Sequence, residues 1–347
     1  MDNTNPHENT SWLDNLRVLA TISVVLLHVA AAYLPPNVKI NNSQWWTANV
    51  YDSLVRFSVP VFVMITGALL LNKEYPLGIY LKKRVTRILF PFLFWILIYY
   101  IHAIIVSKSG FDLSFQGIAK IGSSKIITNT TYHFWYISMI IGIYLFIPII
   151  AKWARKATEK EILYFLLLWL VATILSNRMF SKFTADFDLQ YFSGFIGYVV
   201  LGSYLSLKDF KNIKHIRLIS FGIFCLGVLL TIFGTFYLSQ RAVHFRADLY
   251  AYFAPNVIIA AVGLFVFVKQ INITSRPIIA IRKFLNQQSF GIYFIHILVL
   301  YYCYKVNLGL PELNAGISIP LVTLLCLSIS ATIIYLLRKL KLGKLIG

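Results

Sequence analysis

Apolar runs of about 20 residues recur from one end of this chain to the other. An α-helix needs a run of about that length to cross the hydrocarbon core of a bilayer, whereas the strands of a β-barrel alternate in hydropathy. Hydrophobic residues make up 58% of the 347 and charged residues only 13%, against about 45–50% and about 25% in soluble domains. The sequence therefore predicts an all-α polytopic membrane protein and excludes a barrel.

The apolar runs predict about ten transmembrane helices in one bundle. Their expected positions are 13–34, 52–72, 86–106, 133–151, 161–177, 190–207, 217–238, 250–268, 288–305 and 317–337. The connections are short and contain no low-complexity tract. We therefore expect residues 1–347 to form a single transmembrane domain with no appended soluble domain.

The basic residues are distributed unevenly over the loops. Of the 32 Lys and Arg residues, 21 fall in the even-numbered loops and the C-terminal tail, and nine in the odd-numbered loops. Lys and Arg accumulate in cytoplasmic loops, so this bias predicts that both termini are cytoplasmic, in agreement with an even number of spans. The net charge of +19 follows from this topology, and we expect no nucleic-acid partner.

The first apolar segment, SWLDNLRVLATISVVLLHVAAAYL, contains a cation and an imidazole. Arg17 and His28 are three helical turns apart, on one face and roughly 16 Å apart along the axis. A charge within a membrane helix costs at least about 2.5–3.5 kcal/mol, so its presence suggests a function. Alternatively, Arg17 anchors the topology with Asp14 as its partner, and His28 makes an interhelical hydrogen bond.

A basic cluster, KKRVTRILFPF, lies at the cytoplasmic entrance of the third expected span. Lys83 and Arg87 are separated by four residues and Arg84 and Arg87 by three, so they share one helical surface. Guanidinium groups bind phosphate oxygens well. The alternative is ordinary anchoring by the positive-inside rule.

The ninth expected span, with the sequence QSFGIYFIHIL, carries a polar stripe. Ser289, Tyr293 and His296 fall four and seven residues apart along one helical face. A hydroxyl, a phenol and an imidazole facing the bundle can bind a substrate or relay protons. They can equally hold helices together by hydrogen bonds.

The segment YHFWYI places His133, Trp135 and Tyr136 at the outer interface. Such aromatic residues commonly form an interfacial belt, and a carbohydrate site that stacks on sugar faces is the alternative. Arg56 opens the second expected span near the outer side and is a further candidate for substrate binding. The three cysteines match no metal or redox spacing, and we expect no metal.

Four motifs together resemble the acyltransferase-3 family of integral membrane acyltransferases. They are the arginine–ten residues–histidine pattern of Arg17 and His28, RFSVPVFVMITG with Thr66 in place of the family's serine, RVTRILFPF with Arg84 and Arg87, and SFGIYFIH. The resemblance extends over nearly the whole chain. It is greatest to the single-domain branch that includes the O-acetyltransferase of enterobacterial common antigen. An acidic residue that many relatives carry near the Val59–Pro60 position is missing here.

The resemblance implies an O-acetyltransferase of the bacterial cytoplasmic (inner) membrane. It would move an acetyl group from cytoplasmic acetyl-CoA to a hydroxyl of an extracytoplasmic or lipid-linked cell-surface polysaccharide. His28 would be general base or acyl carrier, Arg17 would be the second catalytic residue, nearer the cytoplasmic surface on the same helix, and the cluster of Lys83, Arg84 and Arg87 would hold the phosphates of acetyl-CoA. The substrate-binding candidates are Ser289, Tyr293, His296, His133, Trp135, Tyr136 and Arg56.

Three other functions stay open at this point. One is a transporter or exporter of a glycan or metabolite, although the internal repeats typical of transporters are not evident. Another is the same family with a different donor such as succinyl-CoA. The third is a non-catalytic scaffold in a polysaccharide assembly complex.

Overall fold

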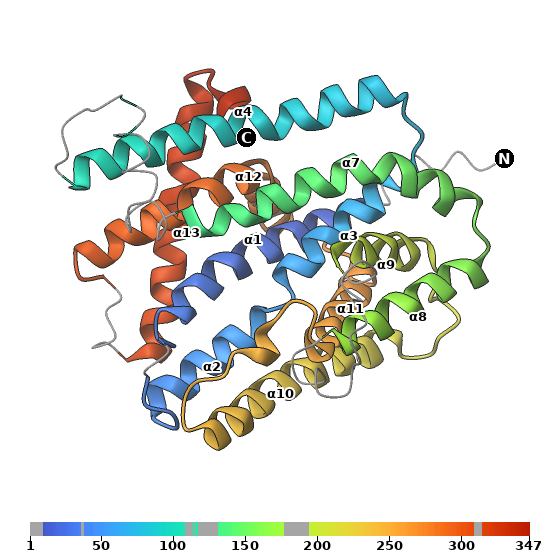
Figure 1. Ribbon diagram of the computed structural model, residues 1–347, viewed down its shortest axis with the longest axis horizontal. Helices are drawn as coiled ribbons and strands as arrows, with labels where there is room; N and C mark the ends of the chain where they lie inside the picture. The colour runs from blue at the N-terminus through green and yellow to red at the C-terminus, as the bar shows by residue number, and fades with distance from the viewer. Residues whose placement is uncertain are drawn as a thin grey trace.

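The computed structural model describes residues 10–35, 38–107, 114, 116, 131–176, 194–308 and 314–347. Within these ranges the chain is entirely helical and contains no strand, and its helices pack into one bundle (Figure 1). One large hydrophobic core extends through almost all of them. The helices are α1 (Ser11–Ala31), α2 (Ser43–Val55), α3 (Ser58–Leu70), α4 (Leu77–Ser107), α7 (Trp135–Lys156), α8 (Glu159–Leu175), α9 (Phe195–Leu207), α10 (Ile216–Ala242), α11 (Pro255–Lys269), α12 (Arg276–Lys305), α13 (Ala315–Lys339) and α14 (Gly343–Ile346), with short 3-10 turns η2 (Tyr132–Phe134) and η4 (Asp248–Tyr250).

Seven segments are long and apolar enough to cross a membrane, judged by length and composition over the described residues. They contain α1, α2 with α3, α4, α7, α10, α11 and α13. The remaining expected spans correspond to α8 and α9, which have 17 and 13 residues, and to α12, whose first half is polar. The chain is thus a multi-pass membrane protein, while the count of ten and the side of the termini stay predictions.

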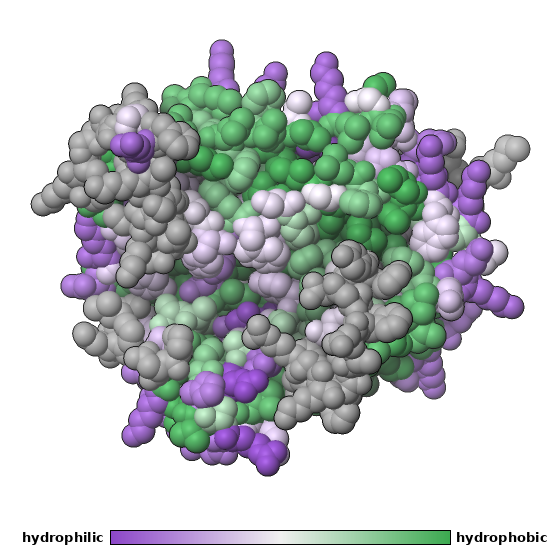
Figure 2. Space-filling model, in the orientation of Figure 1, coloured by the Kyte–Doolittle hydropathy of each residue, from purple (hydrophilic) through white to green (hydrophobic). Residues whose placement is uncertain are grey.

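The surface is apolar where a bilayer would cover it. Large side chains such as Leu93, Leu97, Phe146, Leu167 and Phe233 are exposed on α4, α7, α8 and α10. Figure 2 shows hydrophobic surface along the edge formed by α4, with hydrophilic side chains projecting at the margins. Contact of such an apolar surface with lipid tails is favourable, whereas its exposure to water would cost free energy.

Helix α1 lies inside the bundle and contacts α2, α3, α11, α12 and α13. Leu16, Ala20 and Ala30 are completely buried, and the helix includes several small residues at its contacts. Small side chains let neighbouring helices approach closely within a membrane. The helix that carries Arg17 and His28 is therefore surrounded by protein rather than lipid.

The second expected span is two helices rather than one. Helix α2 ends at Val55, α3 begins at Ser58, and Arg56 lies at the break between them. Pro60 follows as the third residue of α3, within the first turn, where a missing backbone N–H costs no helical hydrogen bond. The break places a cation and freed backbone inside the bundle, where protein can satisfy them.

Two glycines bring α3 and α9 into backbone contact. A Cβ at Gly67 would lie 1.8 Å from the carbonyl oxygen of Val199, and one at Gly202 would lie 2.1 Å from that of Met64. Because the obstructing atoms are backbone atoms, no side-chain rotation can relieve the overlap. The position of α3, and of the site residues that it carries, depends on these glycines.

We expect Gly67→Ala to destabilise the protein by about 1–3 kcal/mol, because the added methyl group forces α3 and α9 apart. The measurement is the unfolding temperature of the detergent-solubilised protein, followed with a thiol-reactive dye that reports the buried cysteines. Gly222→Ala on α10 is the matched control, since a Cβ there meets nothing within 4 Å. Equal unfolding temperatures for the two variants would contradict the close packing of α3 and α9.

Candidate functional site

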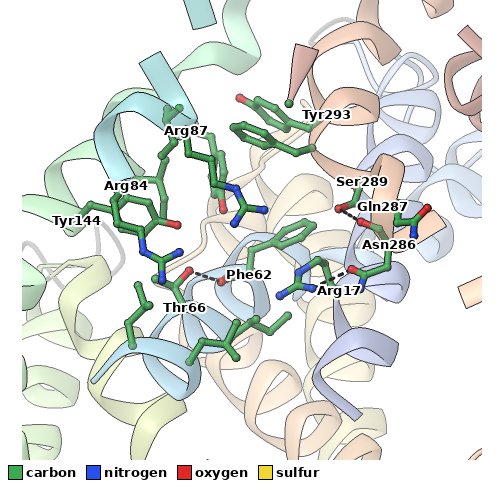
Figure 3. A pocket seen from close by; sticks show the side chains of 18 of the residues that line it. Arg17, Phe62, Thr66, Arg84, Arg87, Tyr144, Asn286, Gln287, Ser289 and Tyr293 are labelled. Atoms are coloured by element: carbon green, nitrogen blue, oxygen red, sulfur yellow. Dashed lines mark hydrogen bonds between the residues drawn. The ribbon is translucent and has the colours of Figure 1, made fainter. Parts of the chain in front are cut away.

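A cavity of about 390 Å³ lies between α1, α3, α4, α7 and α12, and its inner end reaches the first turns of the polar stripe on α12 (Figure 3). It opens beside Lys73 and Tyr75, which are exposed, on the side that the loop charges predict to be cytoplasmic. The lining residues are Arg17, Phe62, Ile65, Thr66, Leu69, Leu70, Lys73, Tyr75, Arg84, Arg87, Ile88, Tyr136, Ile140, Tyr144, Asn286, Gln287, Ser289, Phe290, Tyr293, Arg338 and Gly347.

The charged side chains that line the cavity all have the same sign. The described lining residues include five cations and no aspartate or glutamate. Two of them, Arg84 and Arg87, lie one turn apart on α4 and point into the cavity near Tyr144 (Figure 3). Such an arrangement favours an anion with several oxygen atoms, because guanidinium groups donate paired hydrogen bonds to phosphate.

Arg17 is held in place from two helices. Its Nη1 donates to Asp14 Oδ1 at 3.0 Å and to Asn286 Oδ1 at 2.9 Å, and Asn286 Nδ2 donates to Asp14 Oδ1 at 2.8 Å. The pair of Asp14 and Arg17 expected from the sequence is therefore confirmed. The triangle fixes the guanidinium at the cavity wall and ties α1 to α12, and Figure 3 shows its contact between Arg17 and Asn286.

The sequence analysis did not single out Asn286. It lies three residues before Ser289, so it extends the polar stripe of α12 by one helical turn. The three-residue spacing between Asn286 and Ser289 is the feature of the sequence that could have indicated Asn286 as a site residue. Lys73, Tyr144 and Arg338 were also not singled out, because they come from three separate segments that only the folded chain brings together.

The basic cluster on α4 does not act as one surface. Arg84 and Arg87 line the cavity and Lys83 does not, although Arg87 and Lys83 are both exposed. Thr66, which stands for the serine of the second motif, also lines the cavity, and its hydroxyl donates to the carbonyl of Phe62 at 3.1 Å. All four sequence motifs thus contribute side chains to one cavity, the first through Arg17 and the fourth through Ser289 and Tyr293.

His28 lies beyond the cavity, in a cluster of aromatic residues. Its ring centroid is 5.2 Å from that of His296, which is itself 5.2 Å from that of His133. Tyr132 Oη lies 2.7 Å from His28 Nδ1, within hydrogen-bond distance. Three histidines from α1, α12 and η2, far apart in the sequence, therefore form one cluster in the bundle.

Tyr293 connects the cavity to this histidine cluster. Its ring lines the cavity, and its Oη donates to the backbone carbonyl of His133 at 2.6 Å. The ring of Tyr136 packs 5.3 Å from that of Tyr293 and also lines the cavity. A bound molecule that reaches the inner end of the cavity is therefore separated from the histidines by a thin layer of aromatic rings.

The hydrogen bonds of His296 define its tautomer. Nδ1 lies 2.7 Å from the carbonyl oxygen of Tyr293 and 3.1 Å from that of Ile292. Carbonyl oxygens only accept, so Nδ1 carries the hydrogen and Nε2 of the neutral ring carries the lone pair. Nε2 is buried and has no hydrogen-bond partner among the described residues, so it is an available acceptor next to His28.

Two of the predicted site residues lie elsewhere. Trp135 stacks on Tyr252, with ring centroids 5.6 Å apart, and is 41% exposed. Arg56 is paired with Asp52 and lies over the ring of Tyr250, at a smaller cavity that shares no lining residue with the first. The structure therefore does not bring these two side chains to the cavity of Arg17.

No group of three or more His, Cys, Asp or Glu side chains is placed to hold a metal ion within the described ranges. The three clustered histidines are arranged by ring packing and by hydrogen bonds to backbone and phenol groups. Their geometry fits proton transfer or acyl transfer at an imidazole nitrogen.

Comparison with known proteins decides the chemistry that such a bundle performs. The model named Acyltransferase domain, of the acyltransferase-3 family, matches residues 10–338. The chain belongs to this family. It is also similar to a protein of Bacillus subtilis (strain 168) named "Putative membrane-bound acyltransferase YfiQ", with 23% identity over 354 residues, which cover 95% of this chain and 92% of that protein. No solved structure matches the chain.

Membership of the acyltransferase-3 family makes the protein an acyltransferase and supports this function over the exporter and scaffold considered from the sequence. The match includes every helix that lines the cavity and every histidine of the cluster. The acyltransferase therefore carries its cationic cavity and its imidazoles inside the region that defines the family.

We expect Asn286→Ala to lower the rate of acyl transfer about tenfold. The variant removes two hydrogen bonds to charged groups, with Arg17 and with Asp14, each worth about 1.5–3 kcal/mol, and frees the Arg17 guanidinium to move. Asn15→Ala is the matched control, because it removes a comparable bond between α12 and α1, from Arg282 to Asn15 at 3.0 Å, outside the cavity. The measurement is transfer of labelled acyl groups by membranes that contain equal amounts of each protein. Equal losses in both variants would show that Asn286 acts only through helix packing.

Proposed function

We propose that this acyltransferase takes acetyl groups from cytoplasmic acetyl-CoA and places them on a hydroxyl of a cell-surface polysaccharide, either extracytoplasmic or lipid-linked. The observation that carries the donor is the cavity lined by five cations and no acidic side chain. Coenzyme A is a polyanion whose charge lies on its nucleotide phosphates. Arg84 and Arg87 at the cavity mouth suit those phosphates, with Lys73 and Arg338 nearby.

The shape of the cavity suits the rest of the donor. Beyond the arginines its lining becomes apolar and aromatic, with Phe62, Ile140 and Tyr136. A long pantetheine arm with little charge can extend along such a wall towards Tyr293 and the histidine cluster. The charges of the donor then stay near the cytoplasmic surface, while only the neutral thioester enters the bundle, which avoids the cost of burying phosphate.

Arg17 is placed between these two ends. Hydrogen bonds to Asp14 and Asn286 hold the Arg17 guanidinium at the cavity wall, so it does not move freely within the cavity. In this position the guanidinium faces the donor within the cavity and suits one of its oxygen atoms. It lies roughly 16 Å along α1 from His28, so it orients the donor rather than acting at the carbon where His28 assists the transfer.

His28 has two possible roles in the transfer. As general base it takes the proton of the acceptor hydroxyl while the hydroxyl oxygen attacks the thioester carbon, the carbon–sulfur bond breaks, and the thiolate of coenzyme A leaves and gains a proton. As acyl carrier its imidazole nitrogen attacks the thioester carbon, the carbon–sulfur bond breaks, and the thiolate of coenzyme A leaves with the imidazole proton; the acceptor hydroxyl then attacks the acetyl carbon, the bond to nitrogen breaks, and the hydroxyl proton returns to the imidazole. The lone pair of His296 Nε2 lies next to the His28 ring. In either route His296 is therefore suited to accept a proton from the His28 ring.

The acceptor and the location follow from topology and resemblance. The loop charges support a cytoplasmic position for the cationic cavity and an outer position for the far end of α1, and the resemblance to the family supports the bacterial cytoplasmic (inner) membrane as the location. A polysaccharide acceptor agrees with the resemblance to the single-domain branch that modifies enterobacterial common antigen. Succinyl-CoA is the alternative donor that the same cationic mouth would accept.

We expect Arg84→Ala and Arg87→Ala each to weaken binding of acetyl-CoA by about tenfold or more, because each removes a charge-assisted hydrogen bond to phosphate. Lys83→Ala is the matched control, since this cation belongs to the same helix but is exposed and outside the cavity lining. The measurement is equilibrium binding of radiolabelled acetyl-CoA to the protein in lipid nanodiscs, at two salt concentrations. Equal weakening by all three variants would indicate general attraction to a basic surface and would contradict the donor site.

We expect His28→Ala to abolish transfer of radiolabelled acetyl groups into surface polysaccharide while binding of acetyl-CoA is retained. His28 lies outside the cavity lining, so its removal leaves the donor contacts in place. The assay follows label from acetyl-CoA into polysaccharide in inverted membrane vesicles, with protein amount checked by immunoblot. Normal incorporation by His28→Ala would remove His28 from the mechanism. Label from succinyl-CoA in place of acetyl-CoA would change the donor and keep the site.

A further inference from the structure

A second cavity, of about 250 Å³, lies at the other end of α1. Its walls are the end of α1 (Ala31, Leu34), the break between α2 and α3 (Asp52, Arg56), and the segment between α10 and α11 (Phe245, Tyr250). Arg17 lines the first cavity and Ala31 lines the second, 14 residues or roughly 21 Å further along the same helix. The two cavities therefore lie on opposite sides of the histidine cluster.

The second cavity contains a buried ion pair with unused hydrogen-bonding capacity. Asp52 is 1% exposed, and Arg56 Nη2 lies 2.5 Å from its Oδ1. Asp52 Oδ2 has no hydrogen-bond partner within the described part of the chain, and neither has Arg56 Nε. Buried charged groups normally satisfy all their hydrogen-bonding positions, so a buried acceptor beside a buried donor in a cavity wall points to a ligand.

The surrounding groups define the chemistry of that ligand. A free anion would be repelled by Asp52 and a free cation by Arg56, while an apolar molecule would leave both groups unsatisfied. A hydroxyl satisfies both, because it donates to a carboxylate and accepts from a guanidinium. The Tyr250 ring is buried beneath the Arg56 guanidinium, whose carbon lies 4.0 Å from the ring centroid, and so helps to hold Arg56 in place. Phe245, which is partly exposed in the same wall, supplies apolar surface for the carbon–hydrogen face of a sugar ring.

The size and place of the cavity agree with a small part of a larger acceptor. Cavities for drug-sized molecules begin at about 300 Å³, so this one suits a single sugar unit. Ala31, which lines the second cavity, lies one turn after His28 on α1. A sugar held here would present a hydroxyl group on the His28 side of the bundle.

We propose that the Asp52–Arg56 cavity binds an uncharged sugar unit of the acceptor, with Asp52 accepting a hydrogen bond from one hydroxyl and Arg56 donating to a neighbouring oxygen. This inference rests on the function proposed above, because it assigns the acceptor side of the same reaction. It makes Asp52, which no sequence motif singled out, a residue that selects the acceptor.

The first test separates the acceptor from the donor. We expect Asp52→Asn to lower incorporation of labelled acetyl groups into surface polysaccharide at least tenfold, while acetyl-CoA binding in nanodiscs is unchanged. Asp248→Asn is the matched control, because Asp248 is also paired with an arginine, Arg246 at 2.7 Å, in the same segment but outside the cavity lining. Normal incorporation by Asp52→Asn, or an equal loss with Asp248→Asn, would overturn the proposal.

A second test does not depend on turnover or on the stability of the Asp52 variant. Ala251 lines the second cavity and is exposed, so Ala251→Cys introduces a thiol there that a membrane-impermeant maleimide can label. We expect maltotriose or triacetylchitotriose to slow the labelling at least threefold relative to sorbitol, with the wild-type chain giving the background of its three native cysteines. Protection by citrate instead, or by none of these probes, would overturn the sugar site.

The two tests also separate this inference from the proposed function. If the wild-type protein binds acetyl-CoA but labels no polysaccharide, the proposed acceptor is wrong, whereas protection of the introduced thiol by sugars would still support the cavity. If polysaccharide is labelled normally and sugars give no protection, the function stands and the cavity is not the sugar site.

Discussion

The contact of Arg17 with Asp14 and Asn286 is the interaction on which the rest of the site depends. It joins α1 to α12 at the point where both helices pass the cationic cavity. The same two helices carry His28 and His296 further along, so the contact also sets the distance between those rings. A cation within an apolar bundle needs such fixed partners, because leaving it unpaired would cost more than the folding of one helix can offset.

Charge separates the bundle into functionally different ends. One end presents five cations without an acidic side chain, and the other presents a buried carboxylate paired with a guanidinium. Between them lie imidazoles and phenols, which can pass protons without carrying a permanent charge. The proposed transfer from a polyanionic donor to a neutral acceptor would use this order, because each proposed substrate then meets groups that it can pair with.

Glycine contacts and helix breaks make this arrangement possible. The close approach of α3 and α9 through Gly67 and Gly202 holds Thr66 at the cavity. The break between α2 and α3 directs Arg56 into the second cavity, away from the first. Close backbone packing and interrupted helices are therefore how this bundle creates polar space inside an apolar protein.

The sequence by itself determined the all-helical membrane character, because long apolar runs have few physical explanations. It indicated Arg17, His28, Arg84 and Arg87 as candidate site residues, because polar and charged side chains within or beside such runs are costly unless they have a role. It also indicated Asp14 as the partner of Arg17, since that contact is local to one helical turn. Only the tertiary structure decided that Asn286 completes this contact, that Lys83 lies outside the cavity, that three histidines meet, and that Arg56 belongs with Asp52 at a second cavity. These facts depend on how helices distant in the sequence pack together, and helical periodicity defines the face of each helix without defining its neighbour.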